Sequence, residues 1–104
     1  MWSNNDGMDP NWRPSEPSPK SEMDEVVEAV ADIVKAELHM ARKKFPAFNS
    51  EHEGYAVLKE EVDELWEAVR LKQSDPSRDA RIKKEAVQVA AMAMRFIVDR
   101  CVKD

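Results

Sequence analysis

The chain has 104 residues, 21 of them acidic and 16 of them lysine or arginine, which gives a formal net charge of −5. This length predicts one domain. A hydrophobic fraction of 42%, with 36% charged residues, 7% aromatic residues and only two glycines, favours a helix-rich chain and argues against an all-β fold. The acidic balance disfavours binding to long nucleic acid, which needs a basic surface, but it is compatible with a single nucleotide held through a metal ion.

Several features indicate a cytoplasmic protein without a membrane partner. The longest run without a charged residue, Ala86 to Met94, has nine residues, whereas a bilayer span needs about 20. Residues 1–10 are polar and lack the apolar centre of a secretory signal. The single cysteine, Cys101, cannot form an intrachain disulfide or a cysteine-rich zinc site.

Residues 1–20 contain four of the six prolines and show neither a helical nor a strand period. This composition predicts a disordered Pro/Ser-rich tail, followed by a helical domain over residues 21–104. Trp2 and Trp12 are unusual in such a tail. Two interpretations stay open for them, either solvent-exposed rings or an arm that docks on a neighbouring subunit.

A first helix is predicted from Glu22 to Lys44, because apolar residues recur there at steps of three and four. Ser21 and Asp24 form a weak capping box at its start, and Pro46 ends it. Glu37 lies inside the apolar stripe of this helix. A carboxylate in that position is costly to bury without a partner.

A second helix is predicted from Glu51 to Lys72, where Ser50 and Glu53 form a capping box. The turn at residues 73–77 then leads to the next helix, with Asp75 or Ser77 as its cap. The main apolar stripe of the second helix consists of Tyr55, Leu58, Val62, Leu65, Trp66 and Val69.

The third helix is predicted from Arg78 to Val102, and its centre is apolar nearly all round, with only Gln88 interrupting. A helix of this kind must be covered on all sides, and two partner helices within one short domain cannot easily do that. We therefore expect an all-α, three-helix chain that assembles into a helical bundle as a homodimer or homotetramer.

The acidic residues of the second helix fall on two faces. Glu61 and Glu64 share a narrow strip with Val57 and Ala68, beside the predicted core. The other acids lie opposite the main apolar stripe and are interpreted as a solvated face. They are Glu60, Asp63 and Glu67.

Glu85 and Gln88 form a matching strip on the third helix, so antiparallel packing of the second and third helices brings them to Glu61 and Glu64. Carboxylates that converge without a counter-charge either protonate or bind a cation. Oxygen ligands select Mg²⁺, Ca²⁺ or Mn²⁺, and Mg²⁺ commonly completes its shell with substrate phosphates. This pattern indicates chemistry on a small triphosphate. A solvated acidic face is the alternative, since Glu-x-x-Glu is common on surface helices.

The segment from Phe45 to Asp99 resembles the all-α nucleoside triphosphate pyrophosphohydrolases of the MazG-like superfamily. Their signature pairs Glu-x-x-Glu on one helix with Glu-x-x-Asp on the next. Here the first half is Glu61-Val62-Asp63-Glu64 and the second aligns with Glu85-Ala86-Val87-Gln88. The runs at residues 52–58 and 88–93 resemble a small phage and bacterial branch of that superfamily.

The resemblance implies a helical oligomer with active sites near subunit contacts. It implies hydrolysis of a nucleoside triphosphate, often a deoxynucleotide, to the monophosphate and pyrophosphate, by in-line attack of a metal-activated water. Glu61, Glu64 and Glu85 would be catalytic ligands of Mg²⁺, with Mn²⁺ as an alternative. Gln88 stands where the family usually has Asp and would offer a carbonyl oxygen without a charge. This departure leaves two-metal occupancy, and activity itself, open.

Other residues are candidates for contacts with the substrate. Arg81, Lys84 and Arg95 could meet the phosphates, or could be solvated cations. Glu37 could orient a basic group or a metal-shell water, or could pair with Lys44. Four aromatic residues could form a base pocket or belong to the core. They are Phe45, Phe48, Tyr55 and Trp66.

Two functions from other classes compete with this hypothesis. One is a catalytically silent helical oligomer that binds a nucleotide or a protein partner, which the glutamine at position 88 favours. The other is a purely structural helical dimer.

Overall fold

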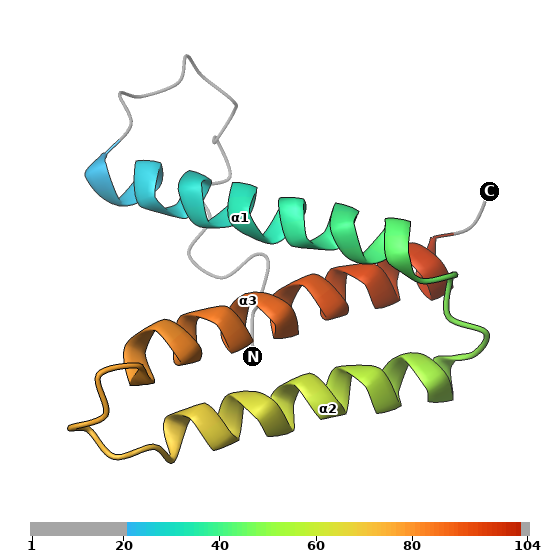
Figure 1. Cartoon of the computed structure of the whole chain (residues 1–104). Helices are drawn as coiled ribbons and strands as arrows, with labels where there is room; N and C mark the ends of the chain where they lie inside the picture. The colour runs from blue at the N-terminus through green and yellow to red at the C-terminus, as the bar shows by residue number, and fades with distance from the viewer. Residues whose placement is uncertain (1–20, 103–104) are drawn as a thin grey trace, which may run out of the picture.

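The computed structural model describes residues 21–102, and within them it contains helices and no strand. In chain order they are α1 (Glu22–Lys44), α2 (Glu51–Val69), α3 (Arg78–Phe96) and a final π-helical turn, η1 (Ile97–Cys101) (Figure 1). The all-α expectation is confirmed. The expected tail at residues 1–20 lies outside the described residues, as do residues 103 and 104.

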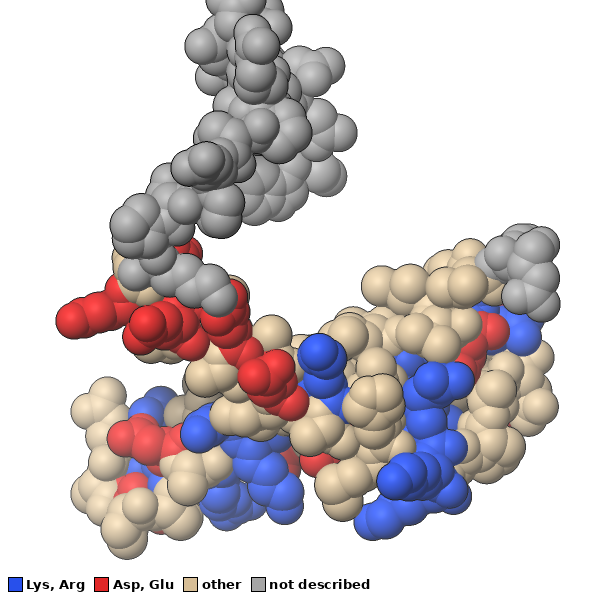
Figure 2. All heavy atoms as spheres, turned by 90° about the horizontal axis from the view of Figure 1, so that it is seen from above, with Lys and Arg blue, Asp and Glu red and all other residues tan. Residues whose placement is uncertain are grey.

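Side chains at both ends of α1 fix its bounds and give it an uneven charge. Ser21 Oγ accepts from the amide of Asp24, while the Asp24 carboxylate accepts from the amide of Ser21, so the expected capping box is present. Acidic residues occupy the first turn and basic residues the last, an arrangement that complements the helix dipole. Figure 2 shows acidic side chains gathered toward one end of this face, with basic side chains toward the other end and also beside the acidic group.

At the start of α2 the cap differs in one detail from the expected capping box. Ser50 Oγ accepts from the amide of Glu53 at 3.0 Å, as expected. The Glu53 carboxylate, however, accepts from the backbone amide and the side-chain amide of Asn49, each at 3.1 Å. Its carboxylate is therefore used in fixing the approach of the chain to α2.

The helix ends are earlier than the hydrophobic pattern predicted. α2 ends at Val69 rather than Lys72, and the α-helical part of α3 ends at Phe96 rather than Val102. The Arg78 guanidinium donates to the carbonyls of Leu71 and Val69, each at 3.1 Å. Because these carbonyls are satisfied from α3, the chain can leave the helix and turn back at that point.

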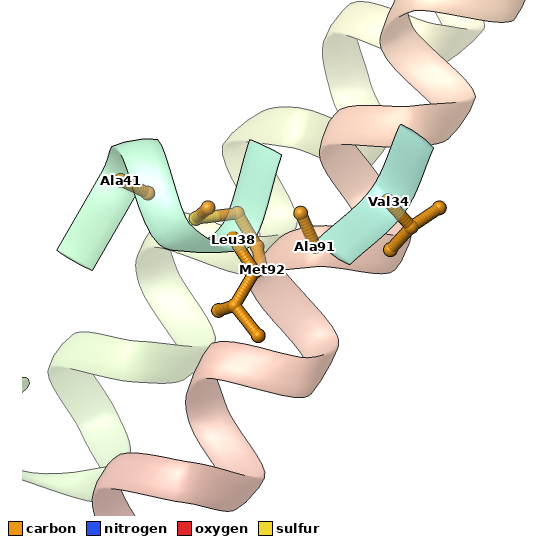
Figure 3. Close-up of a cluster of buried hydrophobic side chains, with 5 residues drawn as sticks. All are labelled: Val34, Leu38, Ala41, Ala91 and Met92. Carbon is orange, nitrogen blue, oxygen red and sulfur yellow. The ribbon is translucent and has the colours of Figure 1, made fainter. Parts of the chain in front are cut away.

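α3 is the central helix, with α2 antiparallel on one side and α1 on the other (Figure 1). The core is built where α1 crosses α3 (Figure 3). Val57 and Leu58 of α2 pack against this cluster. Its buried members are Val34, Leu38, Ala41, Ala91 and Met92.

α2 faces the rest of the chain with a different side from the one expected. Tyr55, Val62, Trp66 and Val69, from its main apolar stripe, are 37% to 61% exposed. The helix buries Gly54 and Ala68 instead, and the strip between them includes half-buried Glu61. The fold therefore turns a carboxylate-bearing strip toward α3 and leaves apolar area on the outside.

The connection between α1 and α2 is fastened to the end of α3. Arg95 Nη2 donates to the carbonyl of Pro46 at 2.7 Å, and its guanidinium stacks 4.0 Å from the ring centre of Phe48. Asp99 Oδ2 accepts from the amide of Phe48 at 3.1 Å. As a result, Phe48 is only 3% exposed, and the connection is held against the end of α3.

No helix in the described part of the chain combines the length and the apolar character that crossing a bilayer would require.

Candidate metal centre and adjoining cavity

Three carboxylates meet between α2 and α3. One oxygen from each of Glu61, Glu64 and Glu85 lies within 4.8 Å of the other two. Glu61 and Glu64 come from successive turns of α2, and Glu85 comes from the facing turn of α3. Glu61 and Glu85 are half-buried and Glu64 is exposed, so the cluster is open to solvent on one side. The structure thus brings together three of the four residues predicted for the metal site.

The electrostatics of the cluster are those of like charges held close. Burial, followed by the negative charges of Glu64 and Glu85, raises the pKa of Glu61 to about 7. Burial and the neighbouring Glu64 also raise the pKa of Glu85, against the opposing effect of Lys84 and Arg81. The carboxyls of Glu61 and Glu85 are thus easier to protonate than a free glutamic acid, and a cation placed among the three carboxylates would offset their repulsion.

The fourth predicted residue, Gln88, turns toward α1. Its Nε2 donates to Oε1 of Glu37 at 2.5 Å, so the carboxylate of Glu37 fixes which way the amide points. Among the described residues, Glu37 forms no ion pair with Lys44 and takes Gln88 as its partner. The Glu37 carboxylate, which looked unpaired in the sequence and is half-buried in the structure, is therefore satisfied from α3.

A cavity of about 460 Å³ adjoins the cluster. Glu61 belongs to the cluster and also lines the cavity, which joins the metal candidate to the cavity. α1 contributes one wall and the Phe45–Phe48 connection closes one end. The residues that line it are Glu37, Met40, Ala41, Lys44, Phe45, Pro46, Phe48, Glu53, Val57, Glu60, Glu61, Gln88, Met92 and Arg95.

The three predicted phosphate contacts occupy different places. Arg81 and Lys84 are exposed on α3, and their charges reach Glu85. They lie beside the carboxylate cluster but do not line the cavity. Arg95 lines the cavity, yet it is buried and committed to Pro46, Phe48 and Asp99, with Arg95 Nε 3.6 Å from Asp99 Oδ2.

The aromatic candidates divide in the same way. Phe45 and Phe48 line the cavity, while Tyr55 and Trp66 are exposed on the outer side of α2. Lys44, which the sequence suggested only as a partner for Glu37, is a cation on the cavity wall. Its place in the basic last turn of α1, directly before Phe45, is the one sequence signal that could have pointed to it.

The donor set fits a hard divalent cation. All three converging groups are carboxylates, which are the ligands that Mg²⁺ and Mn²⁺ take in proteins, and no histidine or cysteine belongs to the cluster. The pKa values of Glu61 and Glu85 are raised first by burial and then by neighbouring carboxylates, and a bound cation would offset the second effect.

Comparisons of the chain with protein-family models, with curated protein sequences and with solved structures found no match. The features of this chain that point to a function are therefore the geometry of the site and the motif spacing.

Proposed function

We propose that this protein is a nucleotide pyrophosphohydrolase that converts a nucleoside triphosphate, with deoxynucleotides as first candidates, to the monophosphate and pyrophosphate in the presence of Mg²⁺. The observation that carries the proposal is the convergence of Glu61, Glu64 and Glu85 at the edge of a cavity of nucleotide size. Small-molecule sites typically enclose about 300–1,000 Å³. We also propose that the protein is homo-oligomeric and cytoplasmic.

In this proposal the carboxylates hold the cation, for which Mn²⁺ is an alternative. Mg²⁺ at such a site offsets phosphate charge and makes a bound water more acidic. Gln88 adds an amide whose orientation Glu37 fixes, so its carbonyl oxygen is available to a ligand on the other side. The phosphates lie toward the exposed cations of α3, Arg81 and Lys84, which are next to Glu85.

The nucleoside occupies the cavity. Phe45 and Phe48 offer aromatic surface, and Met92 and Val57 offer apolar contact. Glu37 lies at the same wall, where its carboxylate can accept hydrogen bonds from a base or a sugar. Arg95 positions the Phe48 ring instead of contacting phosphate.

A catalytically silent nucleotide-binding protein is the second candidate function. The observation in its favour is that position 88 carries an amide engaged with Glu37, so the second motif supplies one carboxylate instead of two. A binding protein would retain the cavity and the cation site but would not turn over.

The test is pyrophosphate release from the eight common ribo- and deoxynucleoside triphosphates, measured with Mg²⁺ and with EDTA. Glu61→Ala is expected to lower the rate on the order of 100-fold. Asp63→Ala is the matched control, since Asp63 lies in the same motif but forms an exposed ion pair with Lys59. It should keep wild-type turnover.

Absence of metal-dependent release from folded protein would contradict the enzymatic proposal. Thermal stabilisation by Mg²⁺ together with a non-hydrolysable triphosphate analogue, lost in Glu61→Ala, would then identify the binding protein. Equal turnover by Glu61→Ala and wild type would remove the carboxylate cluster from the mechanism.

A further inference from the structure

α1 carries a row of large apolar side chains that no other part of residues 21–102 covers. Met23, Val26, Val30, Ile33 and Met40 are 41% to 66% exposed. Their spacing alternates between three and four residues, with Glu37 at the one position between Ile33 and Met40 that breaks the apolar row. We call this set the α1 seam.

The α1 seam is separate from the side of α1 that forms the core. Val34, Leu38 and Ala41 are buried against α3, and the seam runs beside them, turned away by roughly a quarter of the helix circumference at 100° per residue. Within the described part of the chain, one side of α1 forms the core and the seam beside it stays uncovered. An alternating three-four apolar repeat is the pattern by which one helix packs along another.

The distribution of charge along α1 favours one kind of partner helix for the seam. Its first turn contains Glu22, Asp24 and Glu25, and its last turn contains Arg42, Lys43 and Lys44. The two signs lie at opposite ends of the helix (Figure 2). A second copy of α1 running antiparallel places acidic ends against basic ends, whereas a parallel copy would place like charges together.

Small residues flank the seam on its outer side. Ala29 and Ala36 lie one helical turn either side of Ile33 and are exposed. They would let a second helix approach closely at the middle of the row. Two identical helices in antiparallel contact also meet the condition for a closed dimer, in which the same patch serves both subunits.

We propose that the α1 seam is the contact between two copies of this chain, which pack through their α1 helices in antiparallel orientation. The contact rests on the homo-oligomer included in the proposed function and gives it an interface, and mass measurements test it separately from catalysis. The contact between the two chains adjoins the cavity, because Met40 belongs to the seam and also lines the cavity, beside Glu37 and Lys44. The partner helix therefore runs along the α1 wall of the cavity.

The exposed stripe on α2 is the competing surface. Its members, Tyr55, Val62, Trp66 and Val69, also need an explanation. Its nearby charges, however, are already paired within α2, as in Lys59 with Asp63 and Arg70 with Glu67. The α2 stripe has no acidic end and basic end that would favour packing against a second copy of itself. It therefore serves as the control surface.

Mass measurement by light scattering on the full chain tests the location of the contact. Wild type is expected to contain at least two chains of 11.9 kDa. Val30→Lys, in the middle of the seam, is expected to lower the assembly mass at least twofold, and Val26→Glu provides a second variant should the first not fold. Val62→Lys, the control on α2, is expected to keep at least two chains. A monomeric wild type, an unchanged mass for folded seam variants, or a monomeric Val62→Lys would overturn the proposal.

Disulfide trapping tests the orientation. In a Cys101→Ser background, Glu22→Cys and Lys43→Cys place thiols at opposite ends of the outer flank of the seam. Mixing the two variants is expected to give the mixed disulfide in excess of either self-pair. Preferential self-pairing would indicate a parallel contact, and no disulfide would indicate a contact elsewhere. Either result would overturn the proposal.

Discussion

Glu61 is the residue whose pKa depends most on its surroundings in the site. Its pKa is raised to about 7 by burial and by Glu64 and Glu85, whereas an unfolded chain releases this proton near the ordinary pKa of 4.5. Between these two pH values the folded state holds a proton that the unfolded state has lost. The stabilisation is complete below about pH 4.5 and disappears as the pH rises through 7.

We therefore predict that the metal-free protein melts at a lower temperature at pH 8 than at pH 5. The expected difference is a few degrees, since Glu61 is only half-buried and solvent screens part of the effect. Melting curves in EDTA measure it. Glu61→Gln should reduce the difference, and Mg²⁺ at pH 8 should restore the lost stability. A midpoint that rises from pH 5 to pH 8 would contradict the assigned charge balance.

Gln88 and Glu37 form a pair that can be tested by exchange. Gln88→Glu removes the donor to Glu37 and sets two carboxylates against each other, so the free energy of unfolding should fall by about 1–3 kcal/mol. Glu37→Gln combined with Gln88→Glu restores an amide opposite a carboxylate. Urea unfolding in EDTA should show the double variant to be more stable than Gln88→Glu alone. Additive losses would mean that the two side chains do not interact.

At the scale of the helices, Gly54 is a position where the usual preference is reversed. Alanine in place of glycine generally stabilises a helix by about 1 kcal/mol. A Cβ at Gly54 would lie 2.6 Å from Phe96 Cδ2 and 3.1 Å from Phe48 Cδ2, so the rings would have to move. We predict that Gly54→Ala lowers the free energy of unfolding by about 1–2 kcal/mol.

Chemical denaturation of Gly54→Ala, with and without Phe96→Leu, checks this prediction. The smaller side chain should recover part of the loss in the double variant, because it relieves the close approach. A stabilised Gly54→Ala variant would show that α2 does not pack against Phe96 in this way.

The limits of α1 could be predicted from the sequence because they depend on local signals. Ser21 and Asp24 form the capping box, and the chain leaves the helix before Pro46. The inward face of α2 could not be predicted in the same way. Its strongest apolar stripe, with Tyr55 and Trp66, suggested the core side, but burial is decided by the packing of α3 across the turn.

The carboxylate cluster was predictable because helix periodicity alone places Glu61 and Glu64 on one strip and antiparallel packing brings Glu85 to them. The hydrogen-bond partner of Glu37 could not be predicted from the sequence, since Gln88 is 51 residues away and comes near only when α1 crosses α3. The cavity wall formed by Lys44 and Phe45 likewise depends on where the α1–α2 connection is held.

At the scale of the whole molecule, Arg95 and Asp99 hold the α1–α2 connection on the end of α3. Both side chains are almost fully buried, and Arg95 also donates to Pro46 while Asp99 accepts from Phe48. This explains why a short connection with little regular structure forms one end of the cavity. It also gives Arg95 a task that competes with binding phosphate.

Holding the α1–α2 connection and binding phosphate are two roles for Arg95 that predict different results for Arg95→Met. If Arg95 holds the connection, its removal leaves the Asp99 carboxylate buried without its partner and should lower the free energy of unfolding by about 3–5 kcal/mol. Arg81→Gln, which changes an exposed cation beside Glu85, should leave stability within about 0.5 kcal/mol of wild type. If phosphate binds at Arg81, that variant should instead raise the KM for the triphosphate. Unfolding curves and substrate titrations of both variants separate the assignments, and a stable Arg95→Met protein with a raised KM would reverse them.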